Sequence, residues 1–333
     1  MNDSPTQKMK NQQPSQSIGI QSTVSRSPRR EFLRTAMATG AAAFATATLI
    51  GCVPTQIPAG QPDLVWGRRG GKDGRFRKPR AITIDEEDRV FIVDTTGRIQ
   101  HFDVDGNHKN TWSTPAQKNG KPTGIGIARW YSGGSRAANI DADDAAPFRL
   151  IVADTHYYRM LVYQYDGKRD LSVDIGGTSG PLPGQFAFLT DVAQDDRGRF
   201  FIGEYGDRDR IQVFTPTGEF EAQFGSSGVE PGQFLRPQGL MIDGEELWVA
   251  DAMNHRIQIF DISTKTPRLI GLWGELGRER GQMAMPYGID RMSDGTIIVC
   301  EYQNARVQHF DRDGNSLGIL ASLGHEPGQL LDL

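Results

Sequence analysis

The apolar positions of the chain fall in short runs that are separated by turn residues. Residues 211–214 (IQVF) and 257–260 (IQIF) alternate between apolar and polar side chains, as half-buried β-strands do. Turn signals such as Asp105-Gly106 and Asp313-Gly314 separate the runs. No run keeps the 3.6-residue period of an amphipathic helix. The pattern therefore predicts an all-β fold of many short strands.

One unit recurs five times along residues 63–333. In each unit an acidic residue ends an apolar run, an arginine follows four to six residues later, and an aromatic residue comes four residues after the arginine. The acidic residues are Asp94, Asp154, Glu204, Asp251 and Glu301, and the arginines are Arg98, Arg159, Arg210, Arg256 and Arg306. Each unit has four strands, which we name a to d from the axis outward. A unit of about 40–50 residues with four strands is typical of a propeller blade. We therefore predict a β-propeller of four-stranded blades.

The number of blades stays open at this point. Residues 328–333 repeat the segment Gly232–Arg236 that introduces the fourth unit, and residues 63–67 (DLVWG) are similar to an outermost strand. Five repeats are visible. The chain could be truncated, the ring could close with five blades, or it could remain open with an unpaired edge.

The recurring acid and arginine suggest a structural role. A catalytic group need occur only once, whereas this pair occurs in every unit. We interpret the five pairs as hydrogen-bonded clamps that hold the turn between strands b and c.

A propeller commonly binds its ligand at one face of the ring. Here that face is formed by the loops that enter strand a and the loops that join strands b and c. The first set contributes Arg80, Thr123, Thr190, Gln238 and Tyr287, and the second contributes His156, Tyr157, Tyr205, Asp207, Asn254, His255, Tyr302, Gln303 and Asn304. These polar and aromatic side chains suit a protein, peptide or glycan partner.

The motifs P-x-G-[IL], V-x-[DE] and N-H-R-I-Q-[IV]-F resemble the NHL-repeat family over residues 64–333, most specifically in the fourth and fifth units. The second unit departs through an insertion at residues 129–147, and the third has Leu189-Thr190-Asp191 instead of Pro-x-Gly. The resemblance implies that a complete ring has six blades. The regular blades and the lack of a catalytic constellation favour a binding or scaffold module. The alternatives are an enzyme of the lactonase or lyase sort, with a metal in the central channel, and a purely structural spacer.

A zinc site is not indicated by the resemblance. In the peptide-amidating lyases, which are similar propellers, histidines at the x of Pro-x-Gly hold zinc in alternate blades. In this chain those positions hold no histidine; they are Arg80, Thr123, Thr190, Gln238 and Tyr287. We therefore predict no metal and no cofactor, and we expect a non-enzymatic module.

Residues 1–52 read as an export segment. Residues 27–34 (SPRREFLR) resemble a twin-arginine signal, an uncharged stretch follows, and residues 49–52 (LIGC) look like a bacterial lipobox. This predicts transport by the twin-arginine machinery and a lipid on Cys52. Residues 53–62 then form a proline-rich tether, and the domain is anchored to a membrane, facing the periplasm or the cell exterior.

Charge narrows the range of partners. The whole chain has a formal net charge of −4, and the part after Cys52 has 31 Lys and Arg residues against 39 Asp and Glu residues, a net charge of −8. A domain this acidic gives no general electrostatic attraction to nucleic acid. We expect no nucleic-acid partner and an unidentified protein, peptide or glycan of the cell envelope instead.

Overall fold

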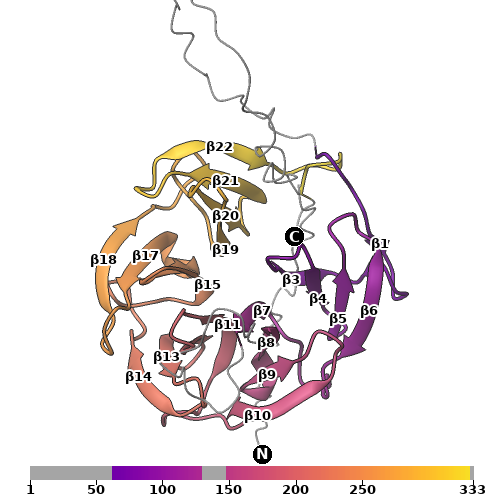
Figure 1. The fold of residues 1–333 in the computed structure, drawn as a ribbon. Helices are drawn as coiled ribbons and strands as arrows, with labels where there is room; N and C mark the ends of the chain where they lie inside the picture. Colours follow the sequence, from indigo (N-terminus) through magenta and orange to yellow (C-terminus); the bar gives the residue numbers. More distant parts are fainter. Residues whose placement is uncertain (1–61, 130–147, 331–333) are drawn as a thin grey trace, which may run out of the picture.

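The structure is a computed structural model, and it describes residues 62–129 and 148–330. Five antiparallel four-stranded sheets are arranged as blades around a common axis (Figure 1). Within each blade the strands follow one another in chain order, and the first strand lies innermost. The predicted all-β propeller is therefore confirmed, with five blades in the described part of the chain.

The bounds of the strands are as follows. Blade 1 is β3 (Pro79–Ile84), β4 (Val90–Asp94), β5 (Arg98–Phe102) and β6 (His108–Ser113). Blade 2 is β7 (Gly124–Arg129), β8 (Phe148–Asp154), β9 (Arg159–Tyr163) and β10 (Arg169–Gly176). Blade 3 is β11 (Phe188–Gln194), β12 (Phe200–Tyr205), β13 (Arg210–Phe214) and β14 (Phe220–Phe224). Blade 4 is β15 (Pro237–Asp243), β16 (Glu246–Asp251), β17 (Arg256–Asp261) and β18 (Arg268–Trp273), and blade 5 is β19 (Pro286–Arg291), β20 (Ile297–Glu301), β21 (Arg306–Phe310) and β22 (Ser316–Ala321).

A short parallel strand pair and two 3-10 helices accompany the five blades. A parallel pair, β1 (Arg68–Arg69) and β2 (Arg75–Phe76), precedes blade 1. The 3-10 helices η1 (Thr155–Tyr157) and η2 (Ala252–Asn254) lie in the turns between strands b and c of blades 2 and 4. Among the described residues, no helix has both the length and the hydrophobicity of a membrane-spanning segment.

The core lies between the blades, because each sheet has two apolar faces to bury. Phe201 and Val213 of blade 3 pack with Leu247 and Val249 of blade 4 in one buried cluster. On the opposite face of blade 4, Trp248 belongs to a separate cluster shared with blade 5. Each blade therefore depends on its neighbours for burial, as stacked repeats do.

The glycine of the Pro-x-Gly motif allows the inner strands to approach one another. A Cβ atom added to Gly239 in β15 would lie 2.5 Å from the carbonyl oxygen of Tyr287 in β19. A Cβ atom added to Gly124 in β7 would lie 2.4 Å from Oδ1 of Asp191 in β11. Such distances are far inside van der Waals contact, so a side chain here would push neighbouring blades apart.

The ring is less closely packed between blade 5 and blade 1. The inner strands lie side by side in the order β3, β7, β11, β15 and β19, whereas no comparable contact joins β19 to β3 within the described residues. The interval between these two strands is the widest in Figure 1. The face of blade 5 on this side carries Ile298, Cys300, Val307 and His309, which are half-buried rather than buried. The equivalent residues of blade 4 are all buried against blade 5: Trp248, Ala250, Ile257 and Ile259.

Candidate functional site

Each acid and arginine pair forms a salt bridge within its blade. The side-chain distances are 2.7 Å for Asp94 and Arg98, 2.9 Å for Asp154 and Arg159, 2.9 Å for Asp251 and Arg256, and 2.6 Å for Glu301 and Arg306; Glu204 and Arg210 are also paired. All five carboxylates are at most 1% exposed. Burial raises the pKa of Asp154 and Asp251, although their arginine partners oppose the shift.

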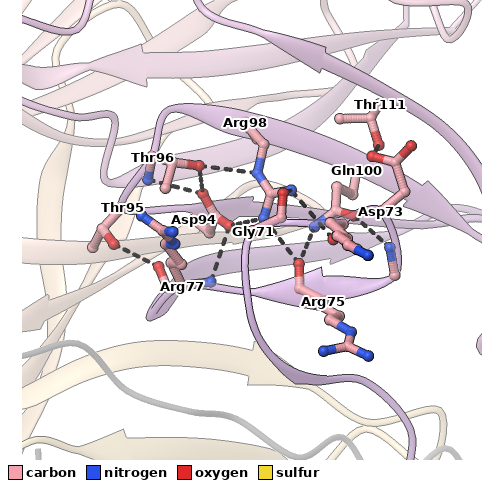
Figure 2. Close-up of polar contacts among 12 residues, drawn as sticks. Gly71, Asp73, Arg75, Arg77, Asp94, Thr95, Thr96, Arg98, Gln100 and Thr111 are labelled. Atoms are coloured by element: carbon pink, nitrogen blue, oxygen red, sulfur yellow. Dashed lines mark hydrogen bonds and ion pairs between the residues drawn. The ribbon is translucent and has the colours of Figure 1, made fainter.

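The blade 1 clamp shows what the pair does (Figure 2). Oδ2 of Asp94 accepts hydrogen bonds from the Arg77 backbone N–H at 3.1 Å and from Nη2 of Arg98 at 2.7 Å. The same Arg98 nitrogen donates to the carbonyl oxygen of Arg75 at 2.9 Å. The clamp thus ties the connector that enters a blade to the turn between strands b and c, and its buried donors and acceptors are used by the fold.

Two asparagines predicted for the binding face are part of these clamps. Nδ2 of Asn254 donates to Oδ2 of Asp251 at 2.8 Å and to the carbonyl oxygen of Gly228 at 3.0 Å. Nδ2 of Asn304 makes the equivalent bonds to Glu301 and to the carbonyl oxygen of Gly277. Both amide groups therefore hold the connectors in place.

Other predicted residues are also engaged within the fold. Oγ1 of Thr123 lies 2.6 Å from Oγ1 of Thr155 and donates to the carbonyl oxygen of Thr190 at 2.9 Å. The Thr190 side chain is 1% exposed, and its hydroxyl has no partner among the described residues. Nδ1 of His255 accepts a hydrogen bond from the Met285 backbone N–H at 3.1 Å. The hydroxyl of Tyr157 accepts one from the Asn119 N–H at 3.0 Å.

Five aromatic side chains and one arginine form a continuous row of contacts at one end of the ring. The ring centroids of His156 and Phe188 are 5.3 Å apart, those of Phe188 and Tyr205 are 5.5 Å apart, and those of Tyr287 and Tyr302 are 4.9 Å apart. Cζ of Arg236 lies 4.5 Å from the Tyr205 ring centroid and 5.2 Å from that of Tyr287. We call this row the mouth belt, and its members are His156, Phe188, Tyr205, Arg236, Tyr287 and Tyr302.

The antiparallel pairing of strands a and b explains why these residues meet. The start of strand a lies beside the end of strand b, as the pairing of Phe188 with Tyr205 shows in blade 3. Arg236 comes directly before β15, Tyr287 lies near the start of β19, and Tyr302 directly follows β20. The mouth belt therefore runs over blades 2 to 5 at the same end of the sheets.

Arg80 of β3 lies close to the mouth belt from the other side of the ring. Burial lowers the pKa of its guanidinium, and its electrostatic neighbours are Tyr205, Tyr287 and Arg236. Burial also lowers the pKa of His156, and the charge of Arg80 adds to that shift. Arg80 makes neither a side-chain hydrogen bond nor an ion pair with any of the described residues, so none of them serves as its counterion.

The prediction from sequence missed the position immediately before the Pro-x-Gly motif. Lys78, Arg236 and Met285 occupy it in blades 1, 4 and 5, with positive φ angles of 52°, 62° and 53°. Lys121 stands there in blade 2 and Phe188 in blade 3. Tyr205, Leu235, Arg236 and Met253 line an open pocket of about 250 Å³ together with Gly206 and Asp209. The recurrence of this position in every unit was the signal that could have revealed it.

Several predictions lie outside the described residues or stay untested. The export segment, Cys52 and all but the last residue of the tether precede the described part, and most of the 129–147 insertion is also outside it. No group of three or more His, Cys, Asp or Glu side chains in the described residues could hold a metal ion. That the protein binds no metal and no cofactor stays a prediction.

Comparisons with known proteins agree with this architecture. The family model of the NHL repeat matches residues 234–260. The chain is 29% identical over 146 residues to "Protein brain tumor" of Drosophila melanogaster, a match that covers 42% of this chain and 13% of that protein. It is 29% identical over 141 residues to "NHL repeat-containing protein 3" of Mus musculus, covering 40% of each chain. The chain thus matches well under half the length of these curated relatives.

A shorter match involves an enzyme. The chain is 39% identical over 87 residues to "Peptidylglycine alpha-amidating monooxygenase" of Rattus norvegicus, which covers 24% of this chain and 9% of that protein. The match therefore concerns a small part of the rat protein.

Solved structures support the fold alone. A chain of the Nidogen/Laminin complex superposes with a TM-score of 0.53 at 15% identity, covering 78% of this chain and 84% of that one. A protein of unknown function from Bacteroides caccae gives a TM-score of 0.51 at 10% identity, with coverages of 73% and 81%. With five antiparallel blades around one axis, the described part of the chain is a β-propeller, and its residues 234–260 match the NHL repeat.

Proposed function

We propose that this propeller is a non-enzymatic binding module whose mouth belt docks a protein or peptide partner. The observation that carries the proposal is the row of half-buried Tyr205, Arg236, Tyr287 and Tyr302 side chains, which contact one another at one end of the ring. Tyrosine and arginine are among the side chains most enriched at the energetic centres of protein interfaces. The exposed Met253 beside them adds an adaptable apolar contact.

The belt is favourable for binding because it is held in place before a partner arrives. Arg236 lies between two tyrosine rings, and its Nε donates to Oε1 of Gln238 at 2.9 Å. Its backbone N–H donates to Oδ1 of Asp209 at 2.7 Å. A side chain that is already ordered loses less conformational entropy when a partner binds.

The experiment that tests this function is a selection of random displayed peptides on the purified protein. We expect the selected peptides to bind the parent chain and to lose at least about tenfold in affinity with the double variant Tyr205→Ala/Tyr287→Ala. Phe220→Ala, which removes a partly exposed aromatic ring from the outer strand β14, is the matched control. Peptides that bind the double variant as tightly as the parent would refute the proposal.

A metal analysis separates this module from the enzyme alternative. Zinc, calcium or iron that stays bound in stoichiometric amount through dialysis would favour a lactonase- or lyase-like propeller. The Pro-x-Gly positions of this chain offer no histidine, which is why we place the binding module first.

We also propose that a lipid on Cys52 anchors the propeller to a membrane outside the cytoplasm. The twin-arginine pattern, the uncharged stretch and the lipobox of residues 27–52 support this location. Metabolic labelling with a fatty acid, compared between the parent chain and Cys52→Ala, tests it. Label that is retained by the variant would contradict the anchor.

A further inference from the structure

Four cations stand at or beside the start of strand a in blades 1, 2 and 4 of an otherwise acidic protein. Lys78, Lys121 and Arg236 stand at the position before strand a in three blades, and Arg80 adds a fourth cation from β3. After Cys52 the chain has a net charge of −8. The first three cations occupy equivalent positions of the repeat, although the domain as a whole has more acidic than basic residues.

Arg80 and Arg236 have no counterion within residues 62–129 and 148–330. Nε of Arg236 donates to the amide oxygen of Gln238, which is a neutral acceptor. The charge of Arg236 also adds to the lowering of the Arg80 pKa, so the two guanidinium groups repel one another across the mouth. Half-buried cations of this kind gain most from an external anion, because burial weakens solvent screening.

The one carboxylate in the neighbouring pocket does not neutralise them. Asp209 is 6% exposed, and its Oδ1 accepts the Arg236 backbone N–H. Its Oδ2 accepts the Ser227 hydroxyl at 2.7 Å. Both of its oxygens are therefore used by the loop that shapes the pocket.

Additional donors surround the two guanidinium groups. The hydroxyls of Tyr205, Tyr287 and Tyr302 make no hydrogen bond to any other part of the described chain. A carboxylate at the mouth could accept two parallel bonds from one guanidinium and a further bond from a phenol. The rings of the same tyrosines offer flat apolar surface to the residues on either side of that carboxylate.

We propose that the mouth belt binds an acidic peptide segment, with Arg80 and Arg236 pairing its carboxylates and the tyrosines packing against its apolar side chains. This inference rests on the proposed function and adds the chemistry of the partner. Two guanidinium groups beside the tyrosines suit a few carboxylates, whereas a nucleic acid calls for a basic track that follows successive phosphates. The acidic remainder of the domain would repel such a polyanion.

The test is an array of fluorescent short peptides of mixed sequence, in which every acidic peptide is paired with its Asn/Gln isostere. Binding to the purified full chain is measured by fluorescence anisotropy, together with a single-stranded oligonucleotide of similar length. Arg80→Gln and Arg236→Met are the informative variants, because Gln238 and Met285 fill the equivalent positions of blades 4 and 5. Arg268→Gln, on the outer strand β18, is the matched control.

We expect acidic peptides to bind at least about tenfold more tightly than their isosteres, and to lose that advantage in Arg80→Gln and Arg236→Met but not in Arg268→Gln. Raising the salt concentration should weaken the acidic peptides more than the isosteres. If acidic peptides and their isosteres bind equally, and only Tyr205→Ala/Tyr287→Ala weakens them, this inference is overturned and the proposed function stands. Binding of no peptide would overturn both, and tighter binding of the oligonucleotide through Arg80 would replace the peptide by a nucleic acid.

Discussion

Arg256 holds the clamp of blade 4, and its removal gives the most direct measure of what the clamps contribute. Its Nε donates to Oδ2 of Asp251 at 2.9 Å. Its two Nη atoms donate to the carbonyl oxygens of Val229, Glu230 and Gln233 at 2.7, 2.9 and 2.9 Å. Arg256→Met keeps much of the side-chain volume but leaves a buried carboxylate without its cation.

The loss in the free energy of unfolding depends on the hydrogen bonds that Asp251 keeps in the variant. Removing one partner of a buried pair costs about 3–5 kcal/mol. Asp251 keeps hydrogen bonds from Asn254, from Gln258 and from the Leu235 backbone N–H, which continue to stabilise its charge. We therefore expect the lower end, about 3 kcal/mol, from a total stability of about 5–15 kcal/mol. In a protein of this size that corresponds to a fall in Tm of roughly 6–12 °C.

Thermal unfolding followed by circular dichroism measures this loss. The matched control is Arg268→Met, because Arg268 pairs with Asp261 at 3.3 Å while its side chain is 75% exposed, and we expect its Tm to change by less than roughly 2 °C. Burial already raises the pKa of Asp251, so the folded state favours the protonated carboxyl. The difference in Tm between the parent and Arg256→Met should therefore shrink as the pH falls through the pKa of Asp251 in the folded variant. Equal losses in the two variants would refute the clamp as a major source of stability.

Three further outcomes can be checked by the same thermal method. Gly239→Ala should lower the Tm strongly, because its Cβ would lie 2.5 Å from the Tyr287 carbonyl oxygen. Gly288→Ala should be tolerated, because its Cβ would meet only the Cys300 side chain, at 3.5 Å or more; equal losses would contradict the packing argument. Burial raises the pKa of Asp191 to about 7, so the stability it contributes is present below about pH 4 and lost as the pH rises through 7. The Tm of Asp191→Asn should accordingly gain on the parent between pH 5 and pH 8, and a constant difference would contradict this. Arg80→Gln should keep or raise the Tm, because it removes a half-buried charge that has no counterion in residues 62–129 and 148–330; a loss as large as that of Arg256→Met would reveal a partner for Arg80.

The blades and their clamps could be predicted because their signals are local and repeated. The apolar alternation of residues 211–214 and 257–260 indicates strands, and the structure places them in β13 and β17. The spacing between acid and arginine is a property of one hairpin, so a single blade contains both partners. Asn254 and Asn304 show the limit of this reasoning. Their place in the turn suggested a binding role, but their amides reach back three residues to the clamp carboxylates.

The mouth belt could be predicted only in part, because it joins residues from different blades. Tyr205, Tyr287, Tyr302 and His156 followed from the loop positions, whereas Phe188 and Arg236 did not. The isolation of Arg80 could not be predicted at all. It depends on which side chains face β3 across the ring, and no spacing along the chain contains that information.

The sequence by itself determined the repeating sheet, the turn chemistry and the salt bridge of each blade, because these arise between residues close together in the chain. Only the tertiary structure decided which blade lies against which, which glycines must lack a side chain, and which charges of the described residues meet without a counterion among them. Those features depend on distances between blades. They are set when the apolar faces of neighbouring sheets pack around the axis, and no single repeat contains them.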